Sequence, residues 1–177
     1  MIDIEHMDKK AVHDVMLDLL YSINVGWFKF ETHLREIYSS LDRNPELIKL
    51  LIQINEDFSR YEAKRLRKTL HIEGKDIDSI IEILKHSHWF VFENMQVEKL
   101  TDKRFRMRTI DCSVQKAVKK RGDEPYDCTL GGNLACRKGF FAEINDSATV
   151  KMIFAPPEPS PASADSHVSC EWEISID

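Results

Sequence analysis

Cysteine is the residue type that carries the clearest chemical signal in this chain, because all four cysteines lie in its last third. They are Cys112, Cys128, Cys136 and Cys170, and the first 110 residues contain none. Thiolates are soft donors that suit zinc and iron, and sites with three or four cysteine ligands are common. No two of these cysteines have the CxxC spacing of a zinc ribbon or a ferredoxin. A shared site would therefore have to be assembled by the tertiary fold.

Two interpretations of these cysteines are open on spacing alone. In the first, Cys136 and Cys170 are small buried apolar residues, as most free cysteines are. In the second, the cysteines form a shared metal or catalytic site. His167 is the histidine nearest to a candidate thiol in the sequence, so it is a candidate ligand beside Cys170.

The predicted elements place the thiols in different local settings. Asp111 is expected to cap a short helix over residues 112–121, and a helix N-terminus lowers the pKa of a thiol located there. Cys128 falls in a loop that follows this helix. The strict alternation of VSCEWEISI predicts a closing strand with Cys170 and Trp172 on one face.

The first half of the chain has the apolar periodicity of helices. Apolar residues recur at three- and four-residue steps from about Lys9 to Ser39, with Asp8 as the N-cap, and again after Pro45. Asp76 is predicted to cap a third helix. We therefore expect three long antiparallel helices in an N-terminal bundle.

The pattern changes near Trp89, where WFVFENMQVEKL is rich in β-branched and aromatic residues and predicts a strand. A second strand, KRFRMRTID, is expected after a turn, followed by two short helices and then by strands at residues 149–155 and 168–176. The predicted fold class is α+β. A helical bundle, residues 1–88, packs on a cysteine-bearing antiparallel sheet with short helices, residues 89–177, in the order ββααββ. We expect the two regions to form one compact unit.

Composition excludes several classes of protein. The 177 residues are 42% hydrophobic and 31% charged, which is typical of a folded globular chain. The formal net charge of −5 disfavours nucleic acid as a partner. No run of apolar residues is long enough for a transmembrane helix, so we expect no membrane partner. The N-terminus has no apolar signal segment, which predicts a cytoplasmic protein with reduced cysteines.

Several motifs resemble a family of small cytosolic proteins, typical of anaerobic microbes, that is grouped with L-2-amino-thiazoline-4-carboxylate hydrolase. The most specific are DCSVQKAVKKRGDEPYDC, the run PPEPSP and the closing CEWEI, while VGWF and HWFVFENMQVEKLTD extend the likeness across nearly the whole chain. The family's motif thiols match Cys112, Cys128 and Cys170, and its motif glutamine matches Gln115. Cys136 falls outside these motifs.

The resemblance implies a cysteine-based site, in which Cys136, His167 and Gln115 are additional candidates. Our leading hypothesis is a small cytosolic protein that binds zinc, iron or a small molecule through Cys112, Cys128 and Cys170. The alternative is an enzyme that hydrolyses a cyclic amidine or thiazoline such as L-2-amino-thiazoline-4-carboxylate, with Cys112 as its nucleophile. A third hypothesis is a partner-binding protein that uses its helical half.

Overall fold

The computed structural model describes residues 8–39, 45–122, 127–128, 132–158, 160–161 and 167–177. The chain divides into two compact units, Met1–Asn44 and Pro45–Asp177. The first unit contains the long helix α1, Lys9–Ser39, and the predicted cap is confirmed because Asp8 Oδ1 accepts a hydrogen bond from Ala11 N at 2.8 Å. All other helices belong to the same unit as the sheet.

A four-stranded antiparallel sheet forms the centre of the second unit. Its strands are β1, Asn94–Thr101; β2, Arg104–Ile110; β3, Thr149–Phe154; and β4, Val168–Ser175. They lie in the order β1-β2-β4-β3. Two helices, α5 at Ser113–Arg121 and α6 at Gly132–Ile144, connect β2 to β3. This arrangement confirms the α+β class and the predicted ββααββ order.

Three further helices precede the sheet: α2, Pro45–Leu70; α3, Ile77–Leu84; and α4, His88–Phe92. The predicted Asp76 cap is confirmed, since its side chain accepts a hydrogen bond from Ser79 N at 2.9 Å. Helix α3 is only eight residues long, so the prediction of a third long helix was wrong. The predicted strand start at Trp89 was also wrong, because residues 88–92 form α4 and β1 begins at Asn94.

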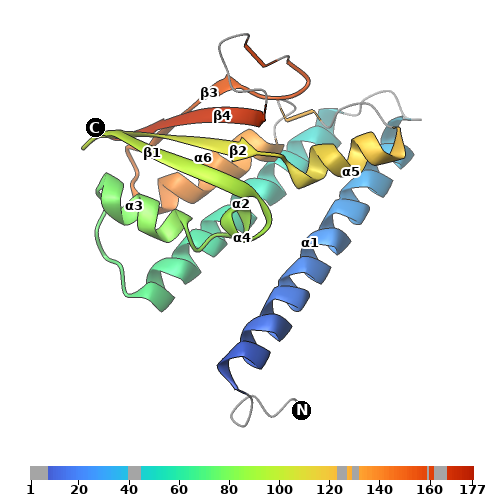
Figure 1. Ribbon diagram of the computed structural model, residues 1–177. Coiled ribbons are helices and arrows are strands. Elements are labelled where there is room, and N and C mark those ends of the chain that lie inside the picture. Colours follow the sequence, from blue (N-terminus) through green and yellow to red (C-terminus); the bar gives the residue numbers. More distant parts are fainter. Residues whose placement is uncertain (1–7, 40–44, 123–126, 129–131, 159, 162–166) are drawn as a thin grey trace. The chain divides into compact units, whose positions relative to one another are not determined.

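The core lies on one face of the sheet. Figure 1 shows α2, α3 and α6 on this face. Alternate residues of the two central strands point toward these helices, where Phe105, Met107, Trp172 and Ile174 are fully buried. They belong to a cluster that includes, from the helices, Ala63, Ile77, Ile80, Ile83, Leu84, Trp89, Phe140, Phe141 and Ile144. The opposite face of the sheet carries the charged residues of the same strands.

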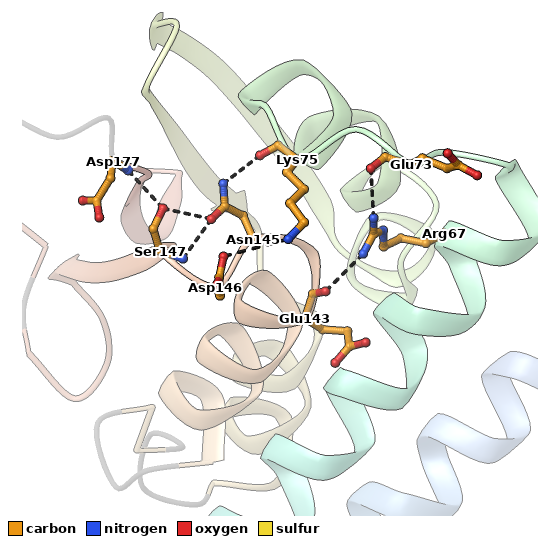
Figure 2. Close-up of polar contacts among 8 residues, drawn as sticks. All are labelled: Arg67, Glu73, Lys75, Glu143, Asn145, Asp146, Ser147 and Asp177. Atoms are coloured by element: carbon orange, nitrogen blue, oxygen red, sulfur yellow. Dashed lines mark hydrogen bonds and ion pairs between the residues drawn. The ribbon is translucent and has the colours of Figure 1, made fainter.

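Polar contacts join the C-terminal ends of α2 and α6 to the segment before α3 (Figure 2). The Arg67 guanidinium donates hydrogen bonds to the backbone carbonyls of Glu73, at 3.1 Å, and Glu143, at 3.3 Å. Asn145 Nδ2 donates to the carbonyl of Lys75 at 2.9 Å. These bonds satisfy carbonyls that have no partner within a helix, and so fix the helix ends against one another.

Candidate functional site

Cys170 lies in the middle of β4 and points toward the helices, as the alternation predicted. It is buried, and its Sγ accepts a hydrogen bond from Trp172 Nε1 at 3.2 Å. Across the strand pair, Cys170 lies opposite Thr109 of β2. Its thiol is therefore held by the central strands and by the indole two residues later.

Cys112 immediately precedes α5 and is half-buried. Its backbone N–H donates to Ser169 Oγ at 3.0 Å, which ties the start of α5 to β4. Asp111 does not cap the helix as predicted, because it adopts a left-handed backbone conformation with φ of 57°. Glu93 occupies this helix end instead, with hydrogen bonds from Ser113 N at 3.1 Å and from Ser113 Oγ at 2.6 Å.

The pKa of Cys112 is raised and not lowered at this helix N-terminus. Burial first, and the negative charge of Glu93 second, raise it from 9.0 to about 12, although backbone hydrogen bonds from Gln115 and Val114 act to lower it. The prediction of a lowered thiol pKa was therefore wrong. The reason is that burial and an adjacent carboxylate outweigh the free amides of the helix end.

Cys128 lies between α5 and α6 and is buried. Its backbone N–H donates to the carbonyl of Pro156 at 2.8 Å, and Gln115 Nε2 donates to its Sγ at 3.7 Å. The pKa of Cys128 is raised to about 11, mainly by burial and secondly by the charge of Cys170, whereas the charge of Arg137 acts to lower it. The charge of Cys170 also raises the pKa of Cys112. The thiols of Cys112, Cys128 and Cys170 therefore lie in one electrostatic neighbourhood.

The other sequence candidates have different places. Cys136 lies on α6 with its Sγ 2.7 Å from Ser59 Oγ of α2, a buried contact between two helices. The side chain of His167 is exposed in the turn before β4 and lines a cleft in the opposite face of the sheet. Of the three additional candidates, Gln115 contacts the thiol of Cys128.

Sequence reasoning missed Arg137, a buried cation on α6. Only 5% of Arg137 is exposed, and its guanidinium carbon is 4.3 Å from the ring centroid of Trp172 and 5.4 Å from that of Trp89. Nη1 donates to the backbone carbonyl of Asn133 at 3.1 Å, whereas Nε has no hydrogen-bond partner among the described residues. In the same part of the chain, no ion pair to a carboxylate involves Arg137.

A signal for Arg137 does exist in the sequence. The residue precedes Phe140, Phe141 and Ile144 by three, four and seven positions, which is the spacing of one buried helix stripe. An arginine in such a stripe indicates a buried charge that requires a specific environment.

We refer to Cys112, Cys128, Cys170 and Arg137 as the thiol–arginine cluster, because charge interactions link Cys170 to the other two thiols and Arg137 to Cys128. These side chains combine two chemical properties. At neutral pH a thiol with a pKa of about 12 is deprotonated in only about one molecule in 10⁵. Arg137 stays charged. With protonated thiols and one charged guanidinium, the four side chains together carry a positive charge, and the charge of Arg137 acts on Cys128. No group of three or more His, Cys, Asp or Glu side chains within the described residues has an arrangement that could hold a metal ion.

These features define an α+β protein with a buried arginine on α6 and a buried cysteine on the central strand β4. The chain belongs to the family of unknown function DUF6125, whose model matches residues 13–176 and thus extends from α1 to β4. Neither the curated proteins nor the solved structures gave a match. No helix within the described ranges has both the length and the apolar composition needed to cross a membrane.

Proposed function

We propose that this protein binds a small anionic molecule in the thiol–arginine cluster. The observation that carries the proposal is the burial of Arg137 without a carboxylate partner in the described part of the chain. Burial of an ion costs several kcal/mol of free energy, and a buried charge that has no charged partner leaves this cost uncompensated. A bound anion would supply the missing opposite charge.

Contacts within the protein offset only part of this cost. A desolvated cation above an aromatic ring gains about 2 kcal/mol, and Arg137 lies close to two tryptophan rings. A Cys128 thiolate would be a natural counter-ion, but with a pKa of about 11 this thiol is protonated at neutral pH. An external carboxylate remains the anion that matches a guanidinium best, because it accepts two parallel hydrogen bonds.

The test compares two neighbouring substitutions on α6. Isothermal titration with acetate, benzoate and L-2-amino-thiazoline-4-carboxylate would measure carboxylate affinity. Arg137→Met, which keeps the apolar contact with the rings, is expected to weaken binding about tenfold or more. Lys138→Met, at an exposed position, is expected to leave it unchanged. Absence of carboxylate binding to the unmodified protein, or equal affinity in both variants, would contradict the proposal.

A soft metal is a second occupant that the three cysteines favour by their chemistry, although their described arrangement does not form a metal site. A divalent ion with three thiolates carries one negative charge, which Arg137 would neutralise. Elemental analysis of protein purified without oxygen tests this alternative. If the protein contains stoichiometric zinc or iron, and if this metal is lost in Cys112→Ser, Cys128→Ser and Cys170→Ser, a metal site would replace the anion site that we propose. Protein free of metal would exclude a metal as the occupant.

Hydrolysis of a thiazoline is the catalytic form of the same proposal, and the position of Glu93 supports it. The Cys112 thiol needs a base before it can attack a C=N carbon. The charge of Glu93 stabilises the protonated thiol, so Glu93 would have to accept the proton while the bond to carbon forms. Turnover of L-2-amino-thiazoline-4-carboxylate that falls at least 100-fold in Cys112→Ser is the expected result. Full turnover in that variant would exclude Cys112 as the nucleophile. We place this activity in the cytoplasm, where thiols stay reduced.

A further inference from the structure

A cleft of about 510 Å³ lies on the face of the sheet that points away from the helices. This volume is within the range of small-molecule sites in proteins. Irregular register between β2 and β4 after Thr109, and between β3 and β4 after Met152, bends the sheet at this end. The cleft is separate from the thiol–arginine cluster, because Glu171 lines it while Cys170 and Trp172 point to the other side of the same strand.

The polar side of the cleft contains two arginines that hold one glutamate. Arg106 Nε is 3.0 Å from Glu171 Oε1, and Arg108 Nε is 2.9 Å from Glu171 Oε2. Both carboxylate oxygens of Glu171 are thus in ion pairs, of which only the one with Arg108 is also a hydrogen bond, and the side chain is only 12% exposed. Two arginines and one glutamate line the cleft, while Glu98 and Glu173, which also pair with these arginines, are not among its lining residues.

Arg106 retains free hydrogen-bonding capacity, whereas Arg108 does not to the same extent. Arg108 Nη2 is 3.1 Å from Glu98, and the nearby Glu171 carboxylate raises the pKa of Arg108. Arg106 Nη2 is 3.7 Å from Glu173 Oε2, beyond hydrogen-bond distance. In the described residues, the Nη groups of Arg106 donate no hydrogen bond. Its two terminal nitrogens have the fork geometry that suits a carboxylate.

Apart from Gln96 and His167, the remaining wall is apolar. It consists of Ile110, Ile153, Phe154, Pro161 and Val168. Ile153 is 38% exposed, so a ligand could remove its side chain from water. A molecule that satisfies both parts of the cleft needs one anionic group and a short hydrocarbon body.

We propose that this cleft is a second binding site, which takes a small amphipathic carboxylate. The carboxylate pairs with the Nη groups of Arg106, and the hydrocarbon body covers Ile153 and Phe154. The proposal is independent of the ligand of the thiol–arginine cluster, because the two sites face opposite sides of β4.

Hexanoate is a suitable probe, with hexanol as its uncharged match, and binding is measured by calorimetry on the full chain. We expect saturable binding of hexanoate, a loss of about tenfold in Arg106→Met, and a change of less than about twofold in Arg104→Met. Arg104 is the matched control because it lies on the same strand and face, pairs only with Glu173 at 3.7 Å, and does not line the cleft.

The apolar wall gives a second variant in case Arg106→Met does not fold. Ile153→Glu places a negative charge at an exposed position and is expected to reduce hexanoate affinity by a similar factor. The proposal fails if hexanol binds as tightly as hexanoate, if Arg104→Met and Arg106→Met lose affinity equally, or if about 10 mM hexanoate gives no heat of binding. If the protein forms a dimer that hexanoate dissociates, this face binds a second copy of the chain, and that result would also overturn the proposal.

Discussion

At the scale of single residues, the pKa of a thiol depends more on its burial than on its position at the start of a helix. Cys112 sits at the start of a helix, yet burial and Glu93 raise its pKa to about 12. The position of Glu93 could not be inferred from the sequence, because β1 and β2 lie between it and the helix that it caps. The position of Cys170 could be predicted, since strand alternation alone determines which face a residue occupies.

Raised thiol pKa values predict slow alkylation of the folded protein. At pH 8 a thiol with a pKa of about 11 is deprotonated in about one molecule in 10³, against about one in ten at the ordinary value of 9.0. Iodoacetamide is therefore expected to modify Cys112 and Cys128 at least about 100-fold more slowly in native protein than in urea. Peptide mass spectrometry measures each rate, and equal rates in both states would contradict the assignment.

The same shifts predict how stability depends on alkaline pH. Folded thiols keep their protons up to pH 11 or 12, whereas unfolded thiols lose them near pH 9.0. The unfolded state then binds fewer protons, so the free energy of unfolding falls as the pH rises from about 9 to about 12. Urea titrations should show a shallower fall in Cys112→Ser and Cys128→Ser. An unchanged slope in both variants would exclude these thiols as the cause.

At the scale of secondary-structure elements, long periodic segments could be predicted and short aromatic ones could not. Helix α1 and strand β4 have strict periods that fit only one type of structure. The segment HWFVF has high strand propensity but forms α4, where Trp89 packs on Phe140 with ring centroids 5.1 Å apart. Tertiary packing of this kind overrides local propensity, and single-sequence patterns do not contain it.

The contact between α2 and α6 predicts that Gly139 does not tolerate a side chain. A Cβ at this position would collide with the backbone carbonyl oxygen of Glu56. Gly139→Ala is expected to destabilise the protein by about 1–3 kcal/mol, because one of the two helices must shift. Lys138→Ala, at an exposed site on the same helix, should change stability by less than about 0.5 kcal/mol. Urea unfolding midpoints would compare the variants, and equal midpoints would contradict this packing.

At the scale of the whole molecule, the boundary between units follows the core and not the change from helix to strand. Sequence patterns placed a boundary near residue 88, where the period changes from helical to extended. The core cluster, however, extends from Ala63 of α2 to Ile174 of β4. Periodicity identifies element types, whereas a unit is defined by long-range contacts that only the folded chain shows.

This organisation predicts which fragments fold. A fragment of residues 45–177 contains the whole described core cluster, so we expect a single cooperative unfolding transition by circular dichroism. A fragment of residues 89–177 lacks Ala63, Ile77 and Ile80 and is expected to show no such transition. Cooperative unfolding of the shorter fragment would place the boundary near residue 88 after all.

Strand β4 separates the thiol–arginine cluster from the cleft, with Cys170 and Trp172 on one side and Glu171 on the other. Because successive residues of a strand face opposite sides of the sheet, this alternation limits how the length of β4 can vary among relatives of the chain. Inserting or deleting one residue before Cys170 within the strand would exchange the two faces and damage both sites together. Length changes should accumulate instead in the connection between β3 and β4, and changes inside the strand should occur in pairs or with a compensating bulge.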